Sequence, residues 1–395
     1  MVEIPPAPIG NPSFLLTLNG RFPRIRNFRF SRSVRSSDLQ ITERTLMKKR
    51  LGASVATVAL ALLGFTAPSS LAATNDDSTC GNTGVICIGV VTDIGHVTDK
   101  SFNQAAWEGA QAGAKAVGGI ANYIESNAAT DTEYGSNMEL FAQKHYSVIV
   151  TVGYLMSNAS ATEAAKYPNI KFIGVDQFLD TTKTTPNYAG LNWHEDQAGF
   201  IAGYLSGYLT KSGKTGEVVG MNIPPVYRYA VGFQNGVAYA AKEQKKKFPA
   251  TKIIYHPAGD NAFSDPAFGA SNAAQMLSQG YDVIFAAGGG TGNGGLARIA
   301  KAKGKFCIGV DVDQWNTVPE AQGCLVTSAE KLIAPGVARL ISQFKAGTFT
   351  GGNVYGKVGI APYHAFTSKV PAAVRAKVAA ITKKILSGSL STGVK

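Results

Sequence analysis

Cysteine and histidine are both scarce in this chain, with four and five residues among 395. Four cysteines are too few for a small scaffold that depends on disulfides. There is no paired CxxC or HxxxH spacing and no Ser-His-Asp order, so nothing indicates a metal centre or a hydrolytic triad. Charged residues make up 16% and hydrophobic residues 45%, which excludes a mainly disordered or coiled-coil protein.

The positive charge of the chain is concentrated in its first 50 residues. They hold ten Lys and Arg against three Asp and Glu, which leaves the rest of the chain only +5 of the formal net charge of +12. A surplus of that size is ordinary surface charge. The sequence therefore predicts no nucleic-acid partner.

Residues 47–73 have the pattern of a secretory leader. Met47 is followed by Lys-Lys-Arg, by an uncharged apolar run to Phe65 and then by small residues. A membrane anchor is the weaker alternative, because Pro68 and two serines interrupt the run. We expect a signal peptide here and export of the mature protein. Residues 1–46 would be an upstream extension or, less readily, an organelle presequence.

Export favours disulfide bonds between the cysteines. Cys80 and Cys87 flank a Gly-Asn-Thr-Gly turn, and Cys307 and Cys324 flank one strand-loop-strand unit. We expect these two local pairs to be bonded. A metal site is not supported, and no cofactor is predicted. The residues before Cys80 lack the small apolar pattern of a lipidation site, so no lipid anchor is predicted.

From residue 85 onward, β-branched runs alternate with helical stretches. Expected strands span 85–91, 119–125, 147–152, 170–175, 215–220, 253–256, 283–287 and 306–310, with helices between them at 101–117, 131–144, 158–166, 196–209, 229–248, 265–279 and 295–301. Continuous apolar strands between helices are typical of parallel sheets covered on both faces. Two such series predict two doubly wound α/β domains, with ligand outside the carboxyl ends of the strands.

The first of these strand ends carries polar and aromatic candidates. Asp93 follows the strand, and Phe102 and Asn103 lie in the first turn of the next helix, which Asp99 or Ser101 can cap. An acid at the end of a buried strand needs a donor partner, which favours a binding role for Asp93. Phe102 faces either core or ligand, and the pattern alone favours core.

Later strand ends add further candidates. Arg228 and Tyr229 are expected near the crevice, and Asp311, the first residue after its strand, is favoured over Asp313 as a ligand contact. The glycines of 288–295 suggest phosphate binding at a helix start. This segment lacks the Lys-Ser/Thr of a P-loop, however, and glycines equally let a flat ring approach the backbone.

Several of these segments occur in the same order in one known family. Thr92-Asp93, the Ser-Phe-Asn turn within 99–109, and segments 287–292, 308–314 and 327–331 resemble the basic membrane protein family. These are substrate-binding proteins of ABC importers, and members similar to the purine nucleoside receptor lipoprotein bind nucleosides. The resemblance covers about residues 85–365 and implies a type I periplasmic-binding-protein fold, in which two doubly wound lobes joined by three crossovers close on ligand.

The resemblance also implies how the chain divides into lobes. We expect an N-terminal lobe of 86–192 plus 316–350 and a C-terminal lobe of 193–315 plus 351–395, with crossovers near 190–196, 313–318 and 348–353.

Aromatic and glycine residues take the first set of roles that the resemblance implies. Phe102 would stack on a purine, and Phe263 would supply the second ring, with Tyr229 as its rival. Gly288 and Gly289 would let the ligand approach the backbone.

Polar residues take the second set. Asp93 and Asn103 would bond the edges of the base, Asp311 would accept from ribose hydroxyls and Lys331 would donate to the same sugar. His96 departs from the family, whose members usually have glycine at that position.

The leading hypothesis is an exported solute-binding protein, acting as a monomer and not as an enzyme. It would bind a purine nucleoside between its lobes and deliver it to an ABC permease of the plasma membrane, at the cell surface or in the periplasm. One alternative is a binding protein for a sugar or another small polar signalling molecule. Another is a nucleoside-processing enzyme that uses crevice acids such as Asp93 and Asp311.

Overall fold

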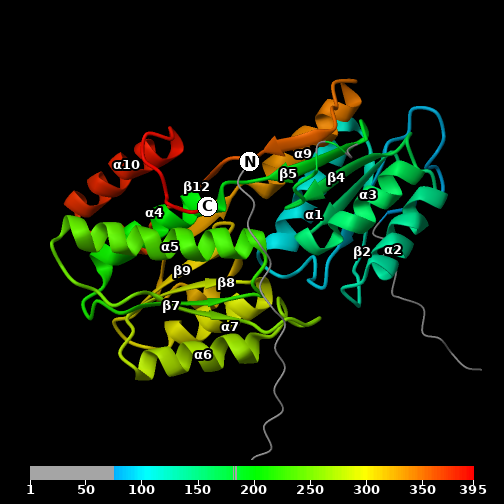
Figure 1. The fold of residues 1–395 in the computed structure, drawn as a ribbon. Coiled ribbons are helices and arrows are strands. Elements are labelled where there is room, and N and C mark those ends of the chain that lie inside the picture. Colours follow the sequence, from blue (N-terminus) through cyan, green and yellow to red (C-terminus); the bar gives the residue numbers. More distant parts are fainter. Residues whose placement is uncertain (1–74, 181, 183–184) are drawn as a thin grey trace, which may run out of the picture. The chain divides into compact units, whose positions relative to one another are not determined.

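A computed structural model describes residues 75–180, 182 and 185–395, which all belong to one compact unit. The expected upstream extension and signal peptide lie outside the described residues. Two parallel sheets dominate the part of the chain that is described (Figure 1). The expected doubly wound α/β architecture is therefore confirmed.

The first sheet has the strand order β11-β5-β4-β3-β1-β2, and all its pairings are parallel. Its strands are β1 (Cys87–Thr92), β2 (Ile120–Ile124), β3 (Val148–Val152), β4 (Lys171–Val175), β5 (Tyr188–Asn192) and β11 (Gly352–Tyr355). On one face of the sheet, an apolar core is formed with α1 (Phe102–Val117) and α9 (Ile333–Lys345). On the other face, a second apolar core is formed with α2 (Asp131–Gln143), α3 (Ser157–Lys166) and the 3-10 turn η1 (Tyr154–Met156). We call this sheet with these helices the first lobe.

The second sheet has the order β12-β10-β9-β8-β6-β7, parallel except for β10 with β12. Its strands are β6 (Thr215–Val219), β7 (Lys252–Tyr255), β8 (Val283–Ala287), β9 (Phe306–Asp311), β10 (Leu325–Lys331) and β12 (Val358–Ile360).

Helices cover both faces of this second sheet. α4 (Glu195–Leu209), α5 (Pro224–Glu243) and α10 (Ala372–Leu386) cover one face, and α6 (Pro266–Ser278) and α7 (Gly289–Ala300) the other (Figure 1). Short helices α8 (Gln314–Thr317), η2 (Pro319–Ala321) and η3 (His364–Phe366) complete this second lobe.

The chain crosses between the lobes after β5, after β10 and after β11. β10 pairs with β9 in the second sheet, whereas the expected first-lobe segment 316–350 included it. The backbone of Cys307 donates to the carbonyl of Cys324 at 2.8 Å, which keeps β9 and β10 neighbours across a short connection. The second crossover therefore lies at 331–333 instead of 313–318, and the third at 355–358 instead of 348–353.

The glycine-rich segment after β8 is helical, whereas the sequence predicted a loop as far as residue 295. α7 already begins at Gly289, so the glycines form its first turns. A Cβ on Gly269 of α6 would lie 1.8 Å from the carbonyl oxygen of Thr291, and one on Gly294 would lie 2.1 Å from that of Pro266. These glycines therefore allow α6 and α7 to pack backbone against backbone.

Both expected cysteine pairs are at bonding distance, with sulfur–sulfur separations of 1.93 Å for Cys80–Cys87 and 2.09 Å for Cys307–Cys324. In the described part of the chain, no helix combines the length and apolar character needed to span a membrane.

Candidate functional site

A cleft lies at the carboxyl ends of strands from both sheets. This is where ligands bind in open parallel sheets. All nine residues predicted as ligand contacts line it: Asp93, Phe102, Asn103, Tyr229, Phe263, Gly288, Gly289, Asp311 and Lys331. The structure thus brings them together, and their roles toward a ligand stay predictions.

One corner of the cleft is a hydrogen-bonded group at the start of α1. Asp99 caps the helix, with its Oδ1 accepting from the backbone of Ser101 at 2.8 Å and its Oδ2 from that of Asn103 at 2.9 Å. Of the two residues expected to cap this helix, Asp99 and Ser101, Asp99 therefore provides the cap. Asn103 Nδ2 donates to Asp93 Oδ1 at 3.1 Å and to Asp99 Oδ2 at 3.2 Å.

These bonds leave acceptors at this corner of the cleft. Asn103 is 2% exposed, and its Oδ1 has no hydrogen-bond partner among the described residues. Burial raises the pKa of Asp93 to about 6, although its carboxylate accepts from Gly95 and Asn103. A ligand that donates hydrogen bonds suits this corner.

A buried ion cluster forms the second polar part of the cleft. Lys331 Nζ donates to Asp176 Oδ2 at 2.5 Å and lies 3.8 Å from Asp311 Oδ1. Both acids adopt left-handed backbone angles, with φ of 60° for Asp176, directly after β4, and 65° for Asp311, the last residue of β9. Such conformations are strained for residues with a Cβ and occur often at functional sites. Burial raises the pKa of Asp311 to about 6.

The cleft is acidic overall. Four acids line it, Asp93, Asp99, Asp176 and Asp311, and Lys331 is the one cation among its lining residues. A phosphate would meet net repulsion there, even though Gly288 and Gly289 begin a helix. The site therefore fits an uncharged ligand better than an anionic one.

The aromatic candidates differ in how freely their rings meet the cleft. Phe102 is half-buried, packs against the core of the first lobe and has Lys331 Nζ 4.6 Å from its ring centroid. Phe263 is also half-buried, and its ring lies over the Cα of Gly220. Tyr229 is only 3% exposed, and its hydroxyl donates to the carbonyl of Ala329 at 3.3 Å. Tyr229 is thus mainly part of the second core.

The loop at 99–101 of the first lobe is bound directly by the second lobe. Asn293 Nδ2 donates to the carbonyl of Asp99, and Thr317 Oγ1 to that of Lys100, both at 2.8 Å. Lys100 Nζ donates to Glu320 Oε1 at 2.9 Å. Ser101 Oγ donates to Asp311 Oδ2 at 2.7 Å. These contacts close the lobes on each other beside the cleft.

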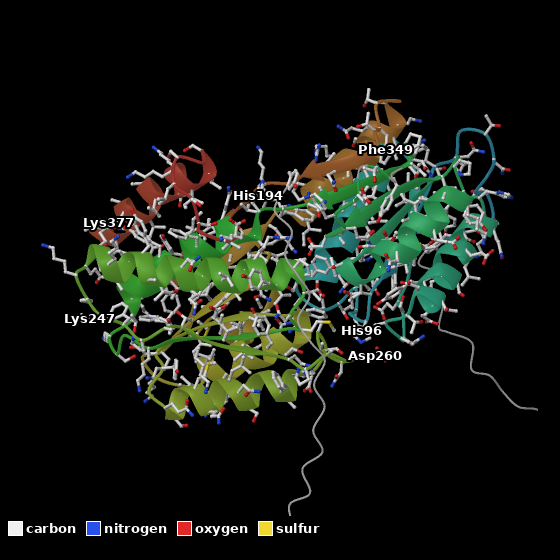
Figure 2. The ribbon with its side chains drawn as sticks, viewed as in Figure 1. His96, His194, Lys247, Asp260, Phe349 and Lys377 are labelled. Carbon is white, nitrogen blue, oxygen red and sulfur yellow. A yellow bond between two sulfur atoms is a disulfide. The ribbon has the colours of Figure 1, made fainter. Side chains whose placement is uncertain are left out.

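Three residues that the sequence singled out lie outside the cleft lining: Arg228, whose Nε donates to Glu195 Oε2, His96 and Asp313. His96 is an exposed side chain of the first lobe (Figure 2), and its Nδ1 lies 3.0 Å from Glu125 Oε2. Asp313 caps α8, accepting from the backbone of Trp315 at 3.3 Å, and its Oδ2 lies 2.7 Å from His364 Nε2. Asp311 is thus the cleft residue of the pair Asp311 and Asp313, as expected.

Sequence reasoning did not include Asp176 or Glu195 in the site. Asp176 directly follows a buried strand, as Asp93 does, and that shared position was the signal for it. Glu195 is the first residue of α4, where an acid suits the helix dipole, so its position in the sequence carries no signal of a functional role. The described residues contain no group of three or more His, Cys, Asp or Glu that could hold a metal ion.

Comparison with solved structures identifies the fold. The chain superposes on a crystal structure of an ABC transporter solute-binding protein from Aeropyrum pernix K1 with a TM-score of 0.67 and 24% identity, covering 78% of this chain and 92% of that one. A likeness at this identity concerns the fold alone. It confirms the expected type I periplasmic-binding-protein fold.

Comparison of sequences identifies the family. The model of the Bmp family, described as PnrA-like ABC transporter substrate-binding proteins, matches residues 86–359. The chain is 32% identical to the CD4+ T-cell-stimulating antigen of Listeria monocytogenes, over 77% of this chain and 87% of that protein. It is 28% identical to the ABC transporter nucleoside-binding protein BmpA of Lactococcus lactis subsp. cremoris, over 78% and 88%. The chain therefore belongs to the Bmp family of ABC transporter substrate-binding proteins.

Proposed function

We propose that this substrate-binding protein captures a purine nucleoside between its lobes and passes it to an ABC permease. The observation that carries the proposal is one cleft that combines half-buried rings, Phe102 and Phe263, with acidic acceptors, Asp93 and Asp311. A purine nucleoside has two flat apolar faces, a hydrogen-bonding edge and a sugar diol. Aromatic rings suit the faces, and carboxylates suit the donors.

Two further facts support a nucleoside over a nucleotide or a bare sugar. The acidic lining disfavours a phosphate group, and the aromatic rings would be poorly used by a ligand with no flat face. The related Lactococcus lactis protein is itself named as nucleoside-binding. In this proposal the protein works as an exported monomer, and the permease recognises the form with closed lobes.

Calorimetric titration tests the proposal directly. Protein freed of co-purified ligand would be titrated with inosine, guanosine, adenosine, uridine and ribose. We expect saturable binding of purine nucleosides and none of ribose. Binding of ribose alone would transfer the protein to the sugar-binding class, and no heat with any purine nucleoside would contradict the proposal.

Phe102→Ala tests the stacking role, with Phe178→Ala as its matched control. Phe178 is 63% exposed and does not line the cleft, so its loss removes a phenylalanine without touching the site. Loss of a stacked ring costs about 1–3 kcal/mol, which corresponds to a loss of affinity of roughly fivefold to 150-fold. Equal affinities of the two variants would show that Phe102 only packs in the core.

A further inference from the structure

Glu195 is a buried acid that does not line the cleft. It is the first residue of α4, directly after the first crossover, and its side chain is fully buried. Its Oε2 accepts a hydrogen bond from Nε of Arg228 in α5 at 2.6 Å. Its Oε1 has no hydrogen-bond partner among the described residues and lies 3.8 Å from Lys331 Nζ. A buried carboxylate is costly unless its charge is compensated, and Arg228 bonds only one of the two oxygens. The placement of the other oxygen, Oε1, therefore calls for an explanation.

The explanation lies in the surroundings of Lys331, the last residue of β10 before the second crossover. Its side chain is 3% exposed and faces three carboxylates. Nζ donates to Asp176 Oδ2 and lies 3.8 Å from both Asp311 and Glu195. Asp176 and Asp311 belong to the cleft wall, whereas Glu195 does not. Glu195 is thus the acid that attracts Lys331 without facing a ligand itself.

The ammonium group of Lys331 also lies close to three aromatic rings. Nζ is 4.6 Å from the ring centroid of Phe102, 5.5 Å from that of Trp193 and 5.7 Å from that of Tyr229. An ammonium over a ring face is attracted to it, so the cation and the Phe102 ring constrain each other. A shift of Lys331 would therefore change both the carboxylates and the ring that meet a ligand.

We propose that Glu195, held in place by Arg228, is a positioning residue that fixes the ammonium of Lys331 between Asp176 and Asp311 and so tunes the affinity of the cleft. Without Glu195, Lys331 moves fully onto the two cleft acids and competes with the hydroxyls of a ligand for them. The pair of Glu195 and Lys331 also joins the residues that flank the first two crossovers. The effect on affinity depends on the proposed function, whereas the placement of Lys331 does not.

The ionisation of Glu195 makes the proposal measurable. Burial and the nearby Asp176 raise the pKa of Glu195, while Lys331 and Arg228 oppose the rise. Other titratable groups on the packed elements are His194 and Asp196 beside Glu195, Tyr227 and Tyr229 of α5, Asp311 of β9 and Glu330 of β10. Because its pKa is raised, Glu195 gains a proton and releases Lys331 at a higher pH than an ordinary glutamate would. Asp93 and Asp311 also titrate and contribute to any pH profile of the protein. The contribution of Glu195 is therefore the part of the profile that disappears in Glu195→Gln.

A ligand-free experiment observes Lys331 itself. The protein would be labelled with ¹⁵N-lysine, and the ammonium resonance of Lys331, identified by its absence in Lys331→Arg, would be followed from pH 5.5 to 8.5. We expect a titration step that is lost in Glu195→Gln, kept in Arg228→Lys and moved to higher pH in Arg228→Met. Glu243→Gln is the matched control, because Glu243 at the end of α5 pairs with Lys377 and neither residue lines the cleft. A Lys331 resonance with the same titration in wild type and Glu195→Gln would overturn the proposal.

Calorimetry with inosine then measures the consequence. We expect Glu195→Gln to weaken binding about tenfold at pH 8, with the difference from wild type shrinking as the pH falls. Arg228→Lys should bind between the two. If wild type binds no nucleoside, the proposed function fails while the resonance of Lys331 still decides the inference. If wild type binds inosine and Glu195→Gln matches it at every pH, the positioning role is refuted. Should Glu195→Gln fail to fold, the two Arg228 variants provide the same comparison.

Discussion

The side chain of Asn293 in the second lobe donates a hydrogen bond to the backbone carbonyl of Asp99 in the first lobe at 2.8 Å. Asn293 Oδ1 in turn accepts from Gln314 Nε2 at 2.8 Å, and Gln314 Oε1 accepts from the backbone of Val310 at 2.9 Å. Val310 immediately precedes the cleft residue Asp311. A chain of amides therefore connects the end of β9, where Asp311 lines the cleft, with the loop that the opposite lobe contributes.

Asn293→Ala should weaken ligand binding without any direct contact to the ligand. The substitution removes a hydrogen bond that forms only when the lobes close, worth about 1 kcal/mol, so we expect affinity to fall roughly fivefold. Small-angle X-ray scattering should show a larger radius of gyration for the ligand-free variant. Asn272→Ala is the control, because Asn272 Nδ2 donates to Phe268 within α6. Equal affinities for both variants would exclude a role of Asn293 in closure.

Asp93→Asn should stabilise the ligand-free protein near neutral pH. The raised pKa of Asp93, about 6, means that its contribution to stability is fully present below its ordinary pKa of 3.8 and is lost as the pH rises through 6. Asparagine removes that loss while its Oδ1 can still accept from Gly95. The expected gain at pH 8 is on the order of 2 kcal/mol.

Thermal unfolding from pH 4 to 8 measures this effect. The melting temperature of wild type should fall relative to that of Asp93→Asn as the pH rises from 4 to 7. Nucleoside affinity should fall in the same variant, because Asn presents a weaker acceptor and an unwanted donor. A melting-temperature difference that stays constant over this pH range would contradict a raised pKa for Asp93.

The burial of Glu217 in the core of the second lobe should make the stability of the protein depend on pH in a second way. Glu217 lies in β6 with no exposed surface, and neither carboxyl oxygen has a hydrogen-bond partner among the described residues. Burial raises its pKa well above the ordinary value of 4.5, so its protonated form is the one that fits the core. Stability is thus fully present below pH 4.5 and is lost as the pH rises through the raised pKa.

Glu217→Gln should remove this loss. We expect the chemical-denaturation midpoint of wild type to decline as the pH rises above 4.5 and that of the variant to decline less. Glu243→Gln, at an exposed glutamate, should follow wild type. Parallel declines in all three proteins would mean that Glu217 has a partner that stabilises its charged form.

The sequence predicted the strands β1 to β4 and β6 to β9, many of which are apolar runs such as Val148–Val152, but it did not predict β5, β11 or β12. The nine candidates all line the cleft, although Asp176 lines it as well and was not among them. Asp93 was suggested by its position directly after a strand, whereas Phe263 and Lys331 were suggested only by the family resemblance. The sequence failed where the information is not local. The lobe to which Leu325–Lys331 belongs depends on pairing with a partner strand, and nothing in the segment itself encodes that choice.

The sequence also did not predict the helical conformation of the glycine-rich segment or the contacts between the lobes. Gly289 and its neighbours have low helix propensity, so a loop was expected, but tight packing of α6 on α7 outweighs that cost. Asn293 and Thr317 gave no signal, because an amide or hydroxyl in a helix usually faces solvent. Their role depends on a loop almost two hundred residues away along the chain.

Loss of the Cys307–Cys324 disulfide should destabilise the second lobe by about 3 kcal/mol. The bond closes a loop with a sequence separation of 17, and the chain-entropy relation gives roughly that value for such a loop. It also joins β9 and β10, the strands that end in Asp311 and Lys331, so ligand affinity should fall with stability. A Cys307→Ala/Cys324→Ala variant would be compared with wild type by urea denaturation and inosine titration.

The bond at Cys80–Cys87 provides the internal comparison for that experiment. It closes a loop with a separation of only 7, so the same relation predicts a smaller loss, about 2 kcal/mol. It ties the segment before β1 to the start of that strand, at the end opposite to Asp93, so its removal should leave inosine affinity unchanged. If the Cys80→Ala/Cys87→Ala variant lost as much affinity as the other double variant, the loss would reflect general destabilisation. An effect on affinity confined to Cys307 and Cys324 would instead show that the strand pair β9 and β10 holds the two cleft residues in register.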